Sequence, residues 1–162
     1  MNIRNRPNIQ VPRIRAIGLT VKDADRSQDF YTQALGFEPV SDIRFETEDY
    51  SDLVGVAGAK IRIVTLQLGD ELIELMEYLN VEGKPIPKDS QSNDLWFQHL
   101  AIAVSDIDRA SAHLQAFPLE PISSSPQTIP PDNTSAGVRA FKFKDPDRHP
   151  LELINATTPQ RQ

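Results

Sequence analysis

Three side chains able to bind a metal or to move a proton interrupt apolar strand patterns in this sequence. Glu74 and Glu152 each lie between two apolar residues, in the segments IELM (73–76) and LELI (151–154), and His99 directly precedes the alternating segment LAIAV. Successive side chains of a β-strand point to opposite faces of the sheet. Each of these three groups is therefore predicted to point away from its apolar neighbours.

The chemistry of these groups depends on whether their faces meet. If the faces form one cleft, two carboxylates and an imidazole converge there with nothing else to neutralise them. A buried carboxylate without a partner costs several kcal/mol or takes up a proton. A divalent metal ion would resolve this charge, and the ligand set Glu74, His99 and Glu152 suits Mn²⁺, Fe²⁺, Ni²⁺, Co²⁺ or Zn²⁺. Either Glu74 or Glu152 could leave the metal and act as a catalytic base.

The sequence contains an internal repeat. The segment IRAIGLTVKD (14–23) matches FQHLAIAVSD (97–106) and places Ala16 on His99, while the two glutamate segments match each other. The chain is therefore predicted to be a tandem duplication of roughly half its length. Recurrence of the glutamates at equivalent places favours a functional role. The alternative is that both are outward residues of half-exposed strands, or relics of a site that decayed when Ala16 arose.

The predicted elements repeat in the same order. Asp23 caps a helix that ends at Gly36, and Asp106 caps its counterpart. The first half reads β-α-β-β-β: strand 14–21, the helix, strand 37–45, a mixed excursion 46–58, and strands 60–68 and 71–78. The second half follows: strand 97–104, a helix to residue 116, a short strand near 119–123, an irregular segment 124–137, and a hairpin of 138–144 with 151–155.

Composition limits the classes of function. The chain has 162 residues, a net charge of −6 and no cysteine. We expect neither nucleic acid nor an anionic membrane as partner, because Lys and Arg form no dense run. Disulfides and thiol catalysis are excluded. There is no apolar run long enough for a signal peptide or a membrane span, so a cytoplasmic location is the default expectation. Two halves of this size would be marginal alone, so we expect them to share one core.

Four segments resemble the vicinal oxygen chelate superfamily, which includes glyoxalases, bleomycin-resistance proteins and extradiol dioxygenases. They are AIGLTVKDADRSQDFYTQALGF (16–37), IELMEY (73–78), QHLAIAVSDIDRA (98–110) and FKDPDRHPLELI (143–154). The resemblance implies an α+β fold of two tandem β-α-β-β-β modules forming a curved mixed sheet around a cleft. The expected organisation is a flexible arm 1–13, a first module 14–78, a linker 79–96, a second module 97–156 and a tail 157–162, in one globular domain.

The resemblance also implies a ligand set. Metal-dependent members place ligands at the positions of Ala16, Glu74, His99 and Glu152 here. Alanine cannot bind a metal, so the expected site has three ligands. His149 is set aside as a ligand, because its place in the turn DPDRHP predicts an exposed side chain.

Three further residues are candidates for substrate binding. Thr65 and Gln67 share a strand face and could orient a substrate oxygen, or only fill the wetter side of the sheet. Trp96 could form the rim of a cleft or pack in the core.

The resemblance implies two functions. The first is a divalent-metal-dependent enzyme, a lyase, isomerase or dioxygenase, that chelates neighbouring oxygens of a small substrate. The alternative is a metal-free small-molecule binding protein of the bleomycin-resistance type. A homodimer is expected in either case, with the cleft built within one subunit or between two.

Overall fold

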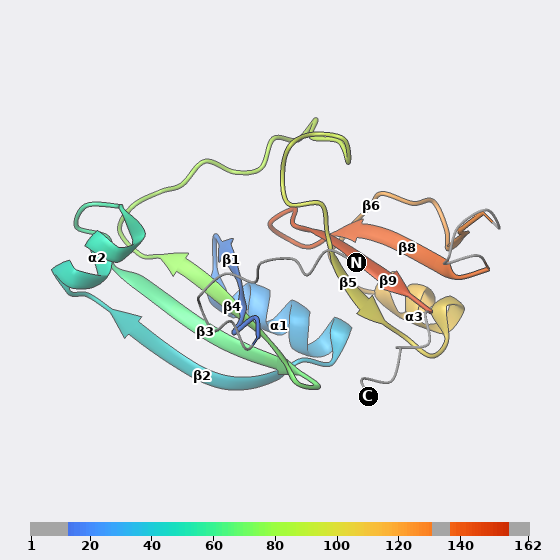
Figure 1. Cartoon of the computed structure of the whole chain (residues 1–162), viewed down its shortest axis with the longest axis horizontal. Helices are drawn as coiled ribbons and strands as arrows, with labels where there is room; N and C mark the ends of the chain where they lie inside the picture. Colours follow the sequence, from blue (N-terminus) through green and yellow to red (C-terminus); the bar gives the residue numbers. More distant parts are fainter. Residues whose placement is uncertain (1–12, 131–136, 156–162) are drawn as a thin grey trace, which may run out of the picture.

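The computed structural model describes residues 13–130 and 137–155 of the chain. Nearly all of the predicted N-terminal arm, the C-terminal tail and part of the segment 124–137 lie outside these ranges. The element order is β1 (Ile17–Val21), α1 (Ala24–Leu35), β2 (Glu38–Phe45), α2 (Glu48–Val54), β3 (Ile61–Leu68), β4 (Glu71–Tyr78), β5 (Leu100–Ala103), α3 (Ile107–Leu114), β6 (Glu120–Pro121), β7 (Gln127–Thr128), β8 (Arg139–Lys144) and β9 (Pro150–Ile154) (Figure 1).

Helices α1 and α3 begin where the sequence predicts. The side chain of Asp23 accepts a hydrogen bond from the backbone N–H of Arg26 at 3.0 Å, and Asp106 accepts one from the N–H of Arg109 at 3.0 Å. Both aspartates therefore satisfy a donor that the first helical turn leaves open. Helix α1 ends at Gly36, whose φ of 75° is the left-handed conformation that glycine adopts without steric cost.

The strands form two mixed sheets with the same internal plan. Within the described residues, the first sheet has the order β1-β4-β3-β2, and the second has the order β5-β9-β8-β6 with β7 also paired to β8. In the first sheet Gly18 pairs with Glu74, and in the second Ala101 pairs with Glu152. The predicted duplication is thus visible in the strand register, and the predicted α+β class is confirmed.

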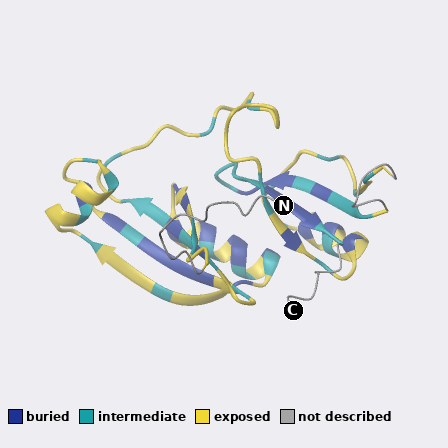
Figure 2. Cartoon of the chain, viewed as in Figure 1, coloured by how far each residue is buried: buried dark blue, intermediate teal, exposed yellow. Residues whose placement is uncertain are grey.

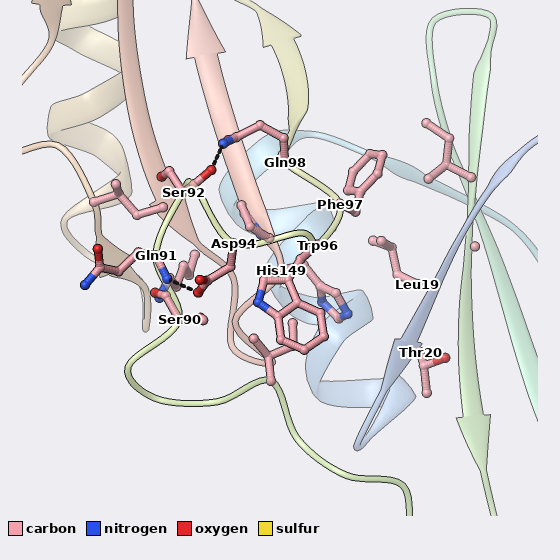
Figure 3. Close-up of a pocket in the computed structure, with 16 residues that line it drawn as sticks. Leu19, Thr20, Ser90, Gln91, Ser92, Asp94, Trp96, Phe97, Gln98 and His149 are labelled. Atoms are coloured by element: carbon pink, nitrogen blue, oxygen red, sulfur yellow. Dashed lines mark hydrogen bonds between the residues drawn. The ribbon is translucent and has the colours of Figure 1, made fainter.

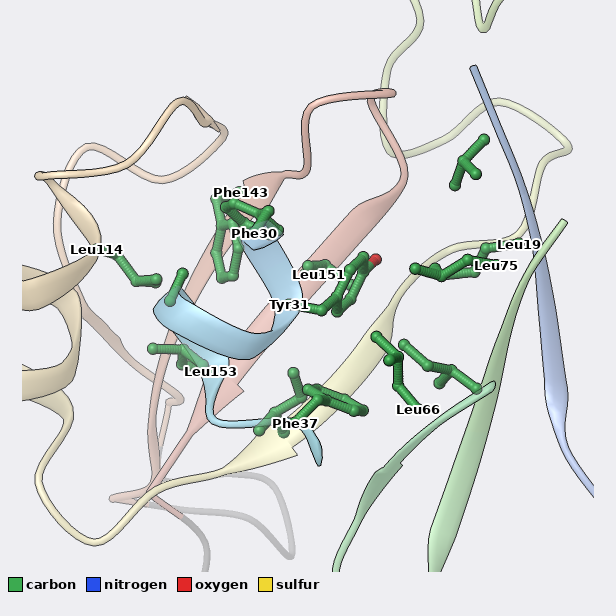
Figure 4. Packing of buried hydrophobic residues seen from close by; sticks show 14 of the residues in the cluster. Leu19, Phe30, Tyr31, Phe37, Leu66, Leu75, Leu114, Phe143, Leu151 and Leu153 are labelled. Atoms are coloured by element: carbon green, nitrogen blue, oxygen red, sulfur yellow. The ribbon is translucent and has the colours of Figure 1, made fainter. Parts of the chain in front are cut away.

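Both sheets bury one face in a shared core. Strands β1, β3 and β4 of the first sheet and β5, β8 and β9 of the second contribute side chains to one cluster with α1 and α3 (Figures 2 and 4). Its largest fully buried members are Tyr31, Leu66, Leu75, Leu114, Phe143, Leu151 and Leu153. The first module also buries Ala59, Ile61 and Ile63 in a small separate cluster, but the larger core is shared by both modules, as expected from their size.

Glu74 and Glu152 lie on the faces turned away from this shared core. Each alternates along its strand with residues of the cluster, which fixes its direction. We call these the outward faces of the first and second sheets. One end of the first outward face is covered by α2, where Tyr50 stacks on Phe45 with ring centroids 4.2 Å apart.

Candidate functional site

A group of polar side chains gathers on the outward face of the second sheet. His99 precedes β5, Glu152 lies on β9 and Lys142 lies opposite Glu152 on β8. His99 Nε2 is 3.8 Å from Glu152 Oε1, and Lys142 Nζ is 3.5 Å from Glu152 Oε2 and 3.2 Å from His99 Nδ1. The Glu152 side chain is only 11% exposed. The structure thus brings two of the three predicted ligands together with an ammonium group.

Lys142 corrects the expectation that nothing else would neutralise the carboxylates. The register of the β8–β9 hairpin places it directly across from Glu152, where opposite charges on facing strands attract. The segments FKFK and LEL predict this pairing only when the length of the turn between them is known. In the first module the place opposite Glu74 is taken by Thr65, which carries no charge.

Gln98 holds this group to the rest of the chain. Its Oε1 accepts a hydrogen bond from Lys142 Nζ at 3.2 Å and lies 3.2 Å from His99 Nδ1. Its Nε2 donates to the carbonyl oxygen of Ser92. The imidazole therefore has polar partners at Nδ1, while Nε2 is turned toward Glu152.

The third predicted ligand, Glu74, lies on the other sheet. In residues 13–130 and 137–155, no three side chains of His, Cys, Asp or Glu form a group that could hold a metal ion. Glu74 has Gly18 and Thr65 as its strand neighbours. Tyr50 of α2 is close to it: burial, and then the negative charge of Glu74, raise the pKa of the Tyr50 hydroxyl.

Ala16 stands where the repeat places a histidine. It precedes β1 by one residue, just as His99 precedes β5, and strand alternation puts it on the same outward face as Glu74. The first sheet therefore carries a carboxylate without an imidazole, and the second carries both.

The predicted substrate-binding residues lie in two places. Thr65 is buried beside Glu74, and the exposed Gln67 further along β3 donates a hydrogen bond to the carbonyl oxygen of Gly69 at 2.7 Å. Trp96 is 58% exposed and lines a cavity, so it is a rim residue and not part of the core.

This cavity, of about 370 Å³, lies between β1, the segment 86–98 and the start of β9 (Figure 3). Its wall is mainly apolar, with Trp96, Phe97 and Leu19 among the lining side chains. Neither His99 nor Glu152 lines it, but Gln98 does and also contacts His99 and Lys142. Through Gln98 the cavity adjoins the polar group on the outward face.

His149 also lines the cavity, and the expectation that it would be exposed is wrong. Its side chain is 15% exposed, and its Nδ1 lies 2.9 Å from Asp145 Oδ2, which also accepts a hydrogen bond from the Tyr31 hydroxyl at 2.9 Å. The β8–β9 turn folds back onto α1, where Ser27 and Tyr31 donate hydrogen bonds to Asp147 and Asp145. The His149 ring also has a hydrogen bond with the backbone of Thr20 in β1. The sequence shows the turn but not the surface on which the turn lies.

Comparison with known proteins identifies a protein family and two similar proteins. The family model described as the Glyoxalase/Bleomycin resistance protein/Dioxygenase superfamily matches residues 13–153. The chain is 33% identical over 147 residues to a 2-epi-5-epi-valiolone epimerase of Actinomyces, covering 88% of this chain and 78% of that protein. It is 27% identical over 143 residues to the uncharacterized protein YwkD of Bacillus subtilis, covering 86% and 94%.

Solved structures share the fold. A glyoxalase family protein from Bacillus cereus superposes with a TM-score of 0.77 at 16% identity, covering 92% of this chain and 97% of that one. The fosfomycin resistance protein FosX from Mesorhizobium loti superposes with a TM-score of 0.58 at 18% identity, covering 92% and 95%. At these identities the likeness concerns the fold alone.

Proposed function

The chain belongs to the glyoxalase/bleomycin resistance protein/dioxygenase superfamily, and from this premise we propose that it is an enzyme that transfers a proton at a carbon next to the carbonyl group of a small, oxygen-rich substrate. Two observations support the proposal. A relative at 33% identity bears the name of an epimerase. The second sheet holds an imidazole and a carboxylate 3.8 Å apart on one face.

We further propose that the complete site forms between two copies of the chain. Glu74 and the His99–Glu152 pair lie on faces turned away from one shared core, so a single chain keeps them apart. A homodimer with two-fold symmetry would bring the first outward face of one copy against the second outward face of the other, twice. Each of its two sites would hold Glu74 from one copy with His99 and Glu152 from its partner.

The residues on the second sheet fit a divalent metal ion. Bonds of about 2.0–2.2 Å place two donors of one ion no more than about 4.4 Å apart, and His99 Nε2 and Glu152 Oε1 are 3.8 Å apart. With Glu74 of a second copy the donors are one nitrogen and two carboxylates, a set that suits Mn²⁺, Fe²⁺, Co²⁺, Ni²⁺ or Zn²⁺. Bound there, the ion would polarise the substrate carbonyl as a Lewis acid.

The two carboxylates would carry the proton transfer. Glu152 removes the proton from the carbon, so that the C–H bond breaks, a carboxyl O–H bond forms, and the electron pair moves onto the carbonyl oxygen. Glu74 on the opposite wall of the site, once it has left the ion and taken a proton from solvent, gives that proton to the other face of that carbon. The configuration is inverted, and the two carboxyl groups return to their starting states by exchange with solvent. Gln98 keeps the His99 ring in place through its contact with Nδ1.

Deuterium exchange tests this proposal directly. The full-length protein, supplied with Mn²⁺ or Ni²⁺, would be incubated in D₂O with 2-epi-5-epi-valiolone and with other small hydroxyketones, and proton NMR would follow both isotope exchange and formation of the epimer. We expect exchange that falls by 10²-fold or more in Glu152→Gln, in line with loss of a general base. Glu82→Gln, in the exposed linker, is the matched control and should keep the wild-type rate. Exchange that Glu152→Gln leaves unchanged would refute the assignment.

A second candidate is metal-free binding of a small molecule. The mainly apolar cavity of about 370 Å³ favours it, and so does the contact of Glu152 with Lys142, which needs no metal ion. The substitution Ala16→His separates the two functions, because it places an imidazole on the outward face that carries Glu74. Isothermal titration with NiCl₂ should show tighter metal binding if the site is a metal centre, and unchanged binding if the protein is a metal-free receptor.

A further inference from the structure

The residue that faces the glutamate on the neighbouring strand differs in charge between the two modules. Thr65 faces Glu74 across β3 and β4, whereas Lys142 faces Glu152 across β8 and β9. We propose that Lys142 is the resident counter-ion of Glu152 and competes with a divalent metal ion for the His99–Glu152 pair, so that residue 142 sets the metal affinity of the site. This inference rests on the proposed function, because it assumes that a metal ion binds there.

The geometry places the ammonium against both donor groups. Lys142 Nζ lies 3.5 Å from Glu152 Oε2 and 3.2 Å from His99 Nδ1, whereas His99 Nε2 and Glu152 Oε1 face each other. A metal ion bound by these two atoms would therefore lie close to the positive charge of the Lys142 ammonium group. The metal must either bind beside this charge or displace the side chain from its present contacts.

Burial strengthens the repulsion between the Lys142 ammonium group and a metal ion bound to His99 and Glu152. The side chains of Lys142 and Glu152 are 26% and 11% exposed, so water screens their charges less than it would on an open surface. Among residues 13–130 and 137–155, the polar groups that contact the Lys142 amine besides Glu152 are Gln98 and His99, and neither carries a fixed negative charge that would offset it. The amine therefore interacts chiefly with the carboxylate that a metal ion would also need.

Lys142 also substitutes in part for the missing fourth ligand. With Ala16 in place of a histidine, the carboxylates of the composite site lack one neutral donor that would help to hold a metal ion. An ammonium beside Glu152 keeps this buried carboxylate paired when no metal is bound, which avoids the cost of an isolated buried charge. Lys142 thus stabilises the site when no metal ion is bound, and the site binds a metal ion more weakly than it would without this lysine.

Lys144 provides a matched comparison. It lies two residues further along β8, on the same face of the strand and with the same charge, but its amine contacts Glu120 at 3.4 Å and the carbonyl oxygen of Ser90 at 3.3 Å. Removing Lys144 changes the net charge of the protein as much as removing Lys142. It does not remove a charge from the His99–Glu152 pair.

The experiment measures metal affinity, not activity. Untagged full-length protein, freed of metal with a chelator, would be titrated with NiCl₂ and with MnCl₂ by isothermal calorimetry at one fixed pH. The variants are Lys142→Thr, which copies the first module, Lys142→Met, which keeps the length of the side chain, and Lys144→Thr. We expect both Lys142 variants to bind metal at least tenfold more tightly than wild type, and Lys144→Thr to stay within about threefold of it. Combining Lys142→Met with His99→Ala should abolish the gain.

The outcomes separate this inference from the proposed function. If wild type binds metal and neither folded Lys142 variant binds it more tightly, the role of Lys142 is refuted while the metal site stands. If wild type and the Lys142 variants all fail to bind metal, the metal centre itself is refuted, and the inference with it. An equal gain in Lys144→Thr would show a general effect of net charge and would also refute it.

Discussion

His149 is a partly buried histidine whose surroundings favour its charged form. Burial lowers its pKa, but the hydrogen bond to Asp145 and the negative charges of Asp145 and Asp147 outweigh that effect, so that the pKa is raised overall from the ordinary value of 6.5. A raised folded-state pKa contributes stability that is fully present below the unfolded-state pKa. That contribution is lost as the pH rises through the folded-state pKa.

We therefore expect the melting temperature of wild type to fall as the pH rises above about 6.5, and to fall less steeply in His149→Gln, which cannot be charged. Differential scanning calorimetry between pH 5.5 and 9 measures both slopes. His113→Gln is the control, because His113 is exposed on α3 and should leave the wild-type slope unchanged. Parallel curves for wild type and His149→Gln would contradict the expectation.

At the scale of single residues, the sequence predicts the face to which a side chain points better than it predicts the residues that the side chain contacts. Alternation along β5 and along β9 predicts that His99 and Glu152 each point away from the core, and the structure has the two side chains 3.8 Å apart. Lys142 was missed because its role comes from the facing strand. The exposure predicted for His149 is wrong because its turn packs on α1 and its ring contacts Thr20 of β1, both more than a hundred residues earlier in the chain.

At the scale of elements, the two capping aspartates define the helices that the modules share. Replacing Asp106 by Ala removes the acceptor that satisfies the N–H of Arg109 at 3.0 Å. We expect a loss of about 0.5–2 kcal/mol in the free energy of unfolding, measured by urea denaturation. Asp106→Ser keeps an acceptor and should lose little. Asp23→Ala on α1 should lose a similar amount, since its cap has the same geometry. A loss in Asp106→Ser equal to that in Asp106→Ala would rule out capping as the cause.

Elements with local signals were predicted, and those held by tertiary contacts were not. Caps and strand alternation mark α1, α3 and the long strands within a few residues. Helix α2 (Glu48–Val54) was predicted only as a mixed excursion, because Ser51 is its one buried residue. Its Tyr50 and Val54 pack against the cluster that contains Ile61 and Ile63 of β3, a contact that the residue pattern of α2 alone does not predict.

At the scale of the whole molecule, the proposed composite site makes a prediction about mixed dimers. Glu74→Gln and Glu152→Gln should each abolish activity in a homodimer. When both chains are co-expressed, each mixed dimer regains one intact site, from the Glu74 of one copy and the Glu152 of the other. With random pairing about a quarter of wild-type activity should return, measured by deuterium exchange on protein whose dimeric state is established by light scattering.

The control for mixed dimers combines two substitutions in the part of the site that one copy contributes, namely His99 and Glu152. Co-expressing Glu152→Gln with His99→Ala should restore nothing, since every site then contains one of the two substitutions. Equal recovery in both mixtures would contradict a site shared between copies, and so would a fully active monomer.

The size of the halves predicted a shared core, and the structure has one. The sequence does not predict how the two sheets are oriented relative to each other. Strand patterns separate inward from outward side chains within a sheet. They do not say which helix or sheet will lie against the inward face.

Helix α1 comes from the first module, yet it packs in one cluster with β8 and β9 of the second. The connection between β4 and β5 therefore tethers two pieces that already hold each other by their packing. A protease cut in that connection should leave a nicked protein whose fragments migrate together and re-form after dilution from urea. The same property makes it a natural place for a gene to be split in two, or for a circularly permuted chain to begin.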